Sequence, residues 1–479
     1  MSRYITTLVL LLLFATSMDG KTWHVGPTRQ YTAPSKVMSL VGNGDTVEID
    51  PGIYVKDVGA WNADSLVLRC SSGYAHLDAQ GTAAQRKAIW VINGKRTYIE
   101  GIEFSGCAID SIDGQNGAGI RMQSNSMECR RCYFHDNQEG ILTGNDTTNE
   151  VLIEACEFDH NGVETGANAG FQHNIYAGHS RVATIKFCYF HRSIIGHELK
   201  TRANVNYILY NHIVDGPTGD GSISIDMPNG GLCYVIGNSI EKGPMTANST
   251  IIGYGEEGII NPDSEFYFVN NTVVTDRNPT RLDTIKPGAK AKLINNILAG
   301  VMHPLNPTAD TISNIISSDV SYFQFVDSKN YDYRISSSFP GMRSGTDPGS
   351  VHGFRLLPAS AYKDPIDSLV VPLFPLHVGA YPPPSAGGDV VAIRLITGRV
   401  NNFPNPFHKA TTIDIGSGLD GIASIAVTDN QGKEIYRSDA MIDHGLLSFD
   451  RGNLPAGVYH YSITTRNYGE PLSGNFVIR

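Results

Sequence analysis

The chain has 479 residues and a formal net charge of −10, and only 18% of its residues are charged, while 50 are glycine. An acidic chain lacks the basic face that phosphate binding needs, which argues against nucleic acid as its main partner. Abundant glycine and few charged helix formers favour strands and turns over long helices.

The first twenty residues have the pattern of a secretory signal peptide. Arg3 precedes the apolar run "LVLLLLF", and small polar residues follow. This run is too short for a membrane anchor, and no later segment is apolar enough to span a bilayer. We therefore expect residues 1–20 to be removed and the mature protein to be exported and soluble, with no transmembrane anchor.

A short β-rich segment ending in Asn, Gly or Asp recurs through the next part of the chain. Intervals between equivalent positions, by subtraction, run from 23 residues (188 to 211) to 33 (238 to 271). Segments of this size cannot bury a core alone and must stack, which indicates a parallel β-helix with three short strands per coil. The aligned position is occupied by Ile102, Cys132, Cys156, Cys188, Asn211, Asn238, Asn271 and Asn296.

The seven cysteines are an odd count for an exported chain, so they do not suggest a complete disulfide framework. Three of them share the repeat position, and we expect these to form a small buried apolar ladder. A metal or redox pair at "CRRC" is the alternative, but no second close pair accompanies it.

The repeats resemble the right-handed parallel β-helix superfamily that includes pectate-lyase-like proteins. "GDTVEIDPGIY" resembles the first coil of that family, and the residues before it resemble its amphipathic capping helix. "FVDSKNYDYRI" and "FPLHVGAY" resemble its closing segments. The resemblance implies an all-β fold, a right-handed parallel β-helix over residues 22–383.

The character of the sequence changes after this region. Residues 384–398 are rich in Pro and Gly and are expected to be a linker. Alternating strands over residues 399–479 predict a small antiparallel β-sandwich. "FPNPF", "LPAGVY" and the basic last residue Arg479 resemble the C-terminal sorting domain of the type IX secretion system. That resemblance implies export by the type IX machinery across both membranes of a Bacteroidota-type cell, then release or surface attachment. An ordinary carbohydrate-binding sandwich is the alternative.

Charge gathers in "GHELKTRA", residues 196–203, and on the coils either side of it. Side chains alternate between the faces of a strand, and neighbouring coils lie about 4.8 Å apart. If the isoleucine and leucine positions point inward, Tyr176, Lys200 and Asp226 form one outward stripe. A second outward stripe is then Asn174, Glu198 and Ser224. His173 and His197 share the inward phase or lie where the strand bends.

This cluster contains what β-elimination on a uronate requires: a cation for the sugar carboxylate and a base for the C5 proton. "LKTRANVNYILYN" resembles the alginate-lyase and chondroitinase-B type of β-helix lyase, which implies that Lys200 is the base beside a Ca²⁺ ion. That family has an Arg on the next coil, where this chain has Asp226. The candidate catalytic residues are Lys200, His197, His173, Arg202 and Tyr176. The candidate substrate-binding residues are Asn174 and Ser224, and Glu198 and Asp226 could hold Ca²⁺ through oxygen ligands.

Structural interpretations stand beside these. The charges could be a surface ion-pair network, and the two histidines could be satisfied core residues. Glu256 and Glu257 are disfavoured as a hydrolytic pair, because adjacent strand residues face opposite ways. His135 and His160 are expected in turns without partners. The sequence favours a secreted lyase acting on an acidic polysaccharide. A non-catalytic surface glycan binder or adhesin, or a glycoside hydrolase or epimerase on the same fold, is the alternative.

Overall fold

The computed structural model describes residues 20–123, 126–300, 303, 309–336, 338–364, 366–370, 376–382, 401–403, 405, 407–414, 421–429, 433–443, 446–465 and 472–479. The predicted signal peptide, apart from its last residue, and the predicted linker lie outside these ranges. The chain divides between residues 388 and 389 into two compact units.

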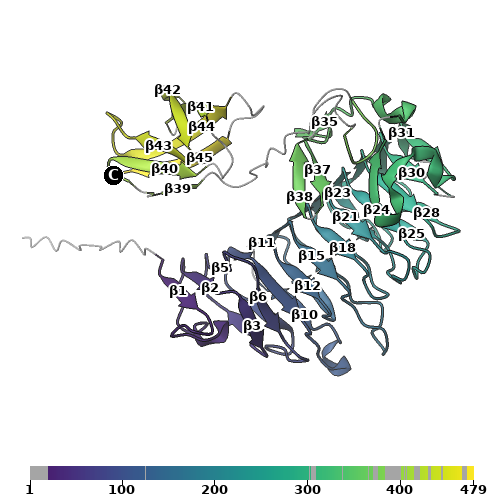
Figure 1. Cartoon of the computed structure of the whole chain (residues 1–479), viewed down its shortest axis with the longest axis horizontal. Helices are drawn as coiled ribbons and strands as arrows, with labels where there is room; N and C mark the ends of the chain where they lie inside the picture. The colour runs from purple at the N-terminus through teal and green to yellow at the C-terminus, as the bar shows by residue number, and fades with distance from the viewer. Residues whose placement is uncertain are drawn as a thin grey trace, which may run out of the picture. The chain divides into compact units, whose positions relative to one another are not determined.

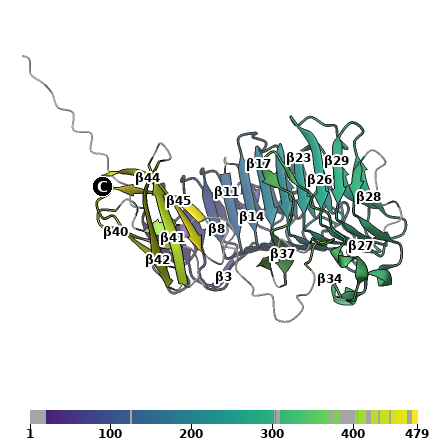
Figure 2. The same cartoon turned by 90° about the horizontal axis from the view of Figure 1, so that it is seen from above.

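The N-terminal unit is a parallel β-helix built from three long sheets, each contributing one strand to a coil (Figure 1). Seen from above, the strands of successive coils lie side by side from β8 to β29 (Figure 2). Within the described residues, no α-helix is present, and every pairing in these three sheets is parallel. The prediction of a stacked all-β solenoid is confirmed.

The three sheets have the following strands. The twelve-stranded sheet contains β1 (Thr22–Val25), β2 (Thr46–Ile49), β5 (Val67–Arg69), β8 (Thr97–Glu100), β11 (Ser126–Arg130), β14 (Glu150–Glu154), β17 (Val182–Lys186), β20 (Val205–Leu209), β23 (Gly231–Ile236), β26 (Ser264–Val269), β29 (Lys290–Ile294) and β31 (Asp310–Ile312). The eleven-stranded sheet contains β3 (Gly52–Val55), β6 (Ala75–Asp78), β9 (Ile102–Ser105), β12 (Tyr133–His135), β15 (Glu157–Asp159), β18 (Tyr189–His191), β21 (His212–Val214), β24 (Ser239–Lys242), β27 (Thr272–Thr275), β30 (Ile297–Ala299) and β32 (Ile315–Ser317). The nine-stranded sheet contains β4 (Gly59–Trp61), β7 (Ala88–Ile92), β10 (Ala118–Met122), β13 (Glu139–Thr143), β16 (Ile175–Ala177), β19 (Leu199–Thr201), β22 (Ile225–Met227), β25 (Thr250–Tyr254) and β28 (Arg281–Ile285).

Short elements complete this unit. They are the 3-10 helices η1 (Pro34–Lys36), η2 (Ser111–Asp113), η3 (Val320–Phe323), η4 (Ser328–Asn330) and η5 (Pro340–Arg343), and the antiparallel pairs β33 (Phe325–Asp327) with β34 (Asp332–Ile335), β35 (Ser350–Val351) with β36 (Phe354–Arg355), and β37 (Ser360–Lys363) with β38 (Asp367–Val370). The predicted amphipathic capping helix is wrong. A single 3-10 turn, η1, stands there, and Val37 just after it is fully buried in the core. Gly42 and Gly44 follow within eight residues of its end, and glycine disfavours continuation of a helix.

Like residues form ladders through the coils, because stacking places the same repeat position above itself. Four buried rings of the eleven-stranded sheet stack with centroids 4.9 Å apart; they are Phe104, Phe134, Phe158 and Phe190. In later coils, at the turn position just before each strand of this sheet, buried Asn side chains form a second ladder that is held by hydrogen bonds. Asn238 Oδ1 accepts from both the main-chain N and the Nδ2 of Asn211, at 2.9 and 3.0 Å.

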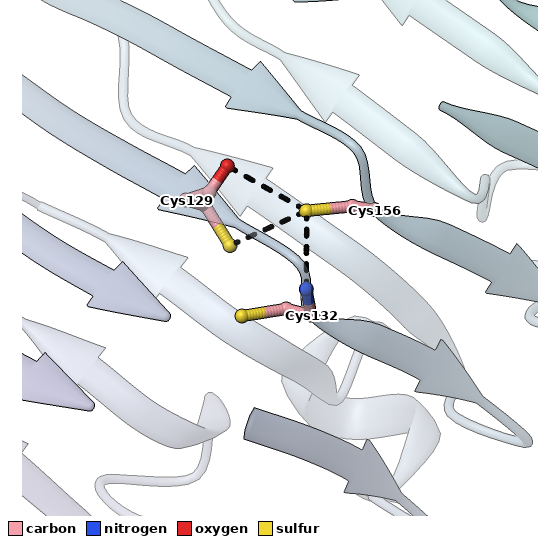
Figure 3. Close-up of side chains that lie close together, drawn as sticks. All are labelled: Cys129, Cys132 and Cys156. Carbon is pink, nitrogen blue, oxygen red and sulfur yellow. Dashed lines mark hydrogen bonds between the residues drawn. The ribbon is translucent and has the colours of Figure 1, made fainter. Parts of the chain in front are cut away.

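Three of the cysteines, Cys132, Cys156 and Cys188, occupy the same turn position as the Asn ladder. Cys156 Sγ accepts from the main-chain N of Cys132 at 3.5 Å, and it lies 3.9 Å from Cys129 Sγ (Figure 3). The cysteine ladder continues into the Asn ladder at Cys188, whose main-chain N–H donates to Asn211 Oδ1 at 3.0 Å. All seven thiols are free and buried. The predicted buried ladder is therefore confirmed, and its sulfur atoms accept from main-chain N–H groups as the Asn oxygens do.

The C-terminal unit contains one antiparallel sheet. Its order is β39-β40-β43-β42-β41-β44-β45, from strands β39 (Asn401–Phe403), β40 (Ala410–Asp414), β41 (Gly421–Thr428), β42 (Glu434–Asp443), β43 (Leu446–Asp450), β44 (Gly457–Thr465) and β45 (Leu472–Ile478). Alternation along β44 places Tyr459, Tyr461 and Ile463 in the core with Phe476. The predicted antiparallel strands are confirmed.

Candidate functional site

Three neighbouring strands of the nine-stranded sheet bring the predicted stripe together. Tyr176 on β16 pairs in register with Lys200 on β19, which pairs with Asp226 on β22. Ile175 and Leu199 are fully buried in the core. Because side chains alternate along a strand, the stripe points outward. The register prediction is confirmed, and we call Tyr176, His197, Lys200, Arg202, Asp226 and Glu257 the outer cluster.

Lys200 and Arg202 converge on one carboxylate. Lys200 Nζ lies 3.2 Å from Glu257 Oε1 and 3.3 Å from Asp226 Oδ2. The Arg202 guanidinium contacts both oxygens of Glu257, at 2.9 and 2.7 Å. Its Nε donates to the Tyr176 hydroxyl at 2.7 Å, and NH1 donates to Asn229 Oδ1 at 2.5 Å. Two cations therefore hold a carboxylate in a bidentate arrangement, the geometry that Arg provides for carboxylate groups.

Glu257 comes from the turn that follows β25. Gly255 begins this turn with φ of 76°, a conformation that favours glycine. The turn is fixed by the Glu257 N–H, which donates to Pro228 O at 3.0 Å. The Glu257 side chain is 48% exposed, whereas those of Lys200 and Arg202 are 12% and 15% exposed. Hydrogen bonds from Arg202, with the Lys200 charge, lower the pKa of Glu257 to about 2. Glu257 is thus an ionised, solvent-facing group that contacts two largely buried cations.

Asp226 has the opposite electrostatics. Its side chain is 4% exposed, and its Oδ1 has no hydrogen-bond partner among the described residues. Burial raises the pKa of Asp226 to about 6, although Lys200 partly offsets this. The ionised carboxylate is therefore held at a cost to the folded state. Such energetically unfavourable groups concentrate at functional sites.

Of the two histidines, His197 belongs to the outer cluster, and His173 is its buried neighbour, only 3% exposed. Their rings stack with centroids 4.6 Å apart, and His173 also packs edge-on against Tyr176. His197 Nε2 lies 3.5 Å from Asp226 Oδ2. The sequence predicted either an inward position or a position at a strand bend. The second is correct, because each histidine lies next to a bend, at residue 174 or 198, that directly precedes its strand.

Both histidines have a fixed proton arrangement. His173 Nδ1 accepts from the main-chain N of His197 at 2.9 Å, and His197 Nδ1 accepts from the N of Ile223 at 3.1 Å. In the neutral ring the proton is therefore on Nε2. Burial, with the charge of Lys200, lowers the pKa of His197 to about 3. The lone pair that a base would use is already occupied in each ring.

The predicted second outward stripe is wrong. Asn174, Glu198 and Ser224 are each no more than 1% exposed. Each lies at a bend just before its strand, and the bend breaks the two-residue alternation that predicted an outward position. Asn174 Nδ2 donates to Glu198 Oε2, and Glu198 Oε1 accepts from the N–H of Ser193 at 2.9 Å. The substrate-binding roles predicted for Asn174 and Ser224 assumed that both side chains face outward, and both are buried.

Glu198 and Asp226, the predicted Ca²⁺ ligands, have separate surroundings. Glu198 faces a buried group of charges in which Lys242 Nζ lies 3.5 Å from Asp215 Oδ2, with both side chains fully buried. Burial, together with Asp215, raises the pKa of Glu198 to about 8. Asp226 instead faces Lys200 and His197. The prediction that this pair shares one ion does not fit the two sets of partners.

Sequence reasoning missed several contacting residues. Glu257 and Asn229 reach the cluster from turns, whose geometry strand alternation does not specify. The expectation that His135 and His160 lack partners is wrong, because both contact Asp136, at 2.7 and 2.8 Å. The sequence did contain a signal for His135. Aligning Phe134 with Phe104 in the repeat places His135 beside Ser105, two residues from Glu103.

Comparison with known proteins assigns the C-terminal unit. Residues 401–478 match the family described as the secretion system C-terminal sorting domain. No curated protein matches the chain. The C-terminal unit is therefore a sorting domain, and the protein is exported by the type IX system to the cell surface or the medium. In the described part of the chain, no helix is long and apolar enough to cross a membrane.

Proposed function

We propose that the β-helix binds and cleaves an acidic, uronate-containing polysaccharide by β-elimination at the outer cluster. The observation that carries this proposal is the site formed by Arg202 and Lys200, which holds the Glu257 carboxylate through contacts to both of its oxygens. Arg202 and Lys200 hold a carboxylate at the protein surface, and a uronate presents the same group. Glu257 then stands in for the sugar carboxylate and leaves when substrate binds.

The proposed reaction divides roles among the cluster. Arg202 neutralises the uronate carboxylate, which makes the C5 proton more acidic. Lys200, as the neutral amine, takes that proton; the C4–O bond breaks, a C4=C5 double bond forms, and the leaving sugar oxygen takes a proton from the Tyr176 hydroxyl or from water. Tyr176, held by Arg202, is placed to contact the hydroxyl or the leaving oxygen. His197, whose Nε2 lies 3.5 Å from Asp226 Oδ2, and His173, whose ring packs edge-on against Tyr176, position those two side chains, since the Nδ1 lone pairs of both rings are occupied.

Export supports an extracellular polymer as the substrate. A type IX passenger meets polysaccharides outside the cell, and the flank of a β-helix suits an extended chain. The net charge of −10 opposes an anionic ligand, so the local cations must overcome the overall field.

The test is a screen of alginate, pectate, hyaluronan and chondroitin against a neutral glycan. We expect one acidic polymer to yield unsaturated uronides, detected by their ultraviolet absorbance. Lys200→Met should abolish the product and Arg202→Gln should raise KM, both with the fold retained by circular dichroism. Glu256→Gln, in the same turn as Glu257, is the matched control. Absence of product from every polymer would refute cleavage.

Glycan binding without cleavage is the second candidate. Lys200 Nζ lies within 3.3 Å of two carboxylates, and this arrangement is also what a purely structural ion-pair network would show. This candidate predicts saturable binding to an acidic polymer, lost in Arg202→Gln, with no product. Calcium, which the sequence suggested, is examined in the same screen by adding EDTA.

A further inference from the structure

A second cluster lies on the eleven-stranded sheet, on three consecutive coils nearer the N-terminus. His76 on β6 is in register with Glu103 on β9, and His135 on β12 is in register with Ser105, two residues after Glu103. Leu77 and Phe104, which alternate with them, are fully buried. The imidazoles and the carboxylate therefore point outward, and their side chains are 18–22% exposed.

These three side chains present their ligand atoms to one another. His76 Nδ1 lies 3.5 Å and His135 Nε2 lies 3.1 Å from the same atom, Glu103 Oε1. All three ligand atoms lie within 4.8 Å of one another. In a tetrahedral site with bonds of about 2.0–2.1 Å, neighbouring ligand atoms are roughly 3.3 Å apart. The separations of 3.1 and 3.5 Å lie just below and just above this value.

Further partners orient both rings for the same purpose. His135 Nδ1 is 2.7 Å from Asp136 Oδ2, and His76 Nε2 is 2.7 Å from Ser105 Oγ. When each of these nitrogens carries the proton, the lone pair of the other nitrogen faces Glu103. In metal sites, a ligating histidine usually donates the N–H of its other ring nitrogen to a carboxylate or carbonyl behind it. Asp136 is itself held by His160 Nδ1 at 2.8 Å.

A cation at this point would satisfy groups that otherwise need protons. His135 faces a carboxylate at each ring nitrogen, so without a cation it needs an added proton to contact both Glu103 and Asp136. His76 can contact Glu103 as a neutral ring, when its Nδ1 carries the proton and its Nε2 accepts from the Ser105 hydroxyl. One ion satisfies all three groups at once.

We propose that His76, Glu103 and His135 form a binding site for a divalent transition-metal cation such as Zn²⁺. Two imidazoles and one carboxylate match the preference of such ions for nitrogen and oxygen ligands, and a fourth position stays open to water. The ion would join three coils of the β-helix, and it is independent of the proposed glycan site.

The same sheet offers a matched control two coils further on. His191 Nε2 lies 3.1 Å from Glu157 Oε1, and His191 Nδ1 lies 3.2 Å from Asp159 Oδ1. The position that corresponds to His76 is Tyr133 there, so the second imidazole is missing. His191→Gln therefore removes a similar ion pair without touching the proposed site.

The experiment is calorimetric titration of Zn²⁺ into the EDTA-treated full chain, with Co²⁺ absorption as a second readout. We expect one equivalent to bind wild type and His191→Gln alike, and the melting temperature to rise with Zn²⁺. Binding should weaken at least tenfold in Asp136→Asn and be lost in His76→Gln and His135→Gln. Absence of saturable binding to wild type would overturn the proposal. So would binding that both histidine variants retain, which would place the ion elsewhere, for example at the buried thiols.

Discussion

The change in unfolding free energy on replacing Asp226 by Asn tells whether Asp226 is a functional carboxylate or part of a structural ion pair, because the two cases predict opposite signs. Asn has nearly the shape of a protonated Asp but carries no charge. If Asp226 stabilised the fold through Lys200, the loss of one partner of a buried pair would cost about 3–5 kcal/mol. The electrostatics described above predict the opposite sign.

The magnitude follows from the pKa. Burial raises the pKa of Asp226 from 3.8 to about 6. The folded state therefore binds a proton between those values that the unfolded state does not bind. This contribution to stability is complete below pH 3.8 and is lost as pH rises through about 6. Two pKa units correspond to about 3 kcal/mol, so Asp226→Asn should gain up to about 3 kcal/mol at pH 8 and nothing at pH 4.

The assay is urea unfolding followed by circular dichroism at both pH values. As a control, Glu164→Gln removes an exposed carboxylate elsewhere on the β-helix and should change the unfolding free energy by less than about 0.5 kcal/mol. Asp226→Asn should also lose activity while it gains stability. A variant several kcal/mol less stable than wild type at pH 8 would refute the reasoning and identify a structural ion pair.

Four further substitutions test the outer cluster, the buried charges and the two ladders. Glu257→Gln weakens an internal competitor for Arg202 and Lys200, so it should lower the Kd for an acidic oligosaccharide, and unchanged affinity by calorimetry would contradict this. Burial raises the pKa of Glu198 to about 8, so its contribution is lost as pH rises from about 4.5 through 8. Glu198→Gln should therefore gain stability relative to wild type across that window, and a constant difference between the two would count against it. Phe158→Ala removes a fully buried ring from the middle of a stack, so it should cost about 3–5 kcal/mol in the same urea assay. A cost below about 1 kcal/mol would show that the stack is dispensable. Asn238→Ala leaves the main-chain N–H of Asn211 and the carbonyl of Ile208 without their partners, and each buried orphan costs about 1–3 kcal/mol. A near-neutral effect would show that water or rearrangement replaces the ladder.

The repeat alone was enough to predict the coils and the outward stripe. Stacking fixes which residues meet, because a shift of one residue would turn Leu199 outward and Lys200 into the core. The same rule failed at Glu198, where a bend reverses the phase before the strand begins. Strand periodicity carries no information about bends or turns, so Glu257 and Asn229 could not be placed.

The second cluster shows a related limit. His135 was expected in a turn without partners, yet it ends β12 and meets Glu103 from the coil before it. Glu103 lies 32 residues before His135 in the sequence, and only the register of the two neighbouring coils brings them together. The sorting domain was predictable because its motifs are local in the sequence and need no such register.

The central claim is that Arg202 and Lys200 form a seat for a glycan carboxylate. A crystal structure of the Lys200→Met variant, which retains Arg202, with an acidic oligosaccharide bound tests it most directly. The account predicts a uronate carboxylate on the Arg202 guanidinium, with the Glu257 side chain displaced toward solvent. An oligosaccharide bound elsewhere on the β-helix, with Glu257 still paired to Arg202, would contradict it.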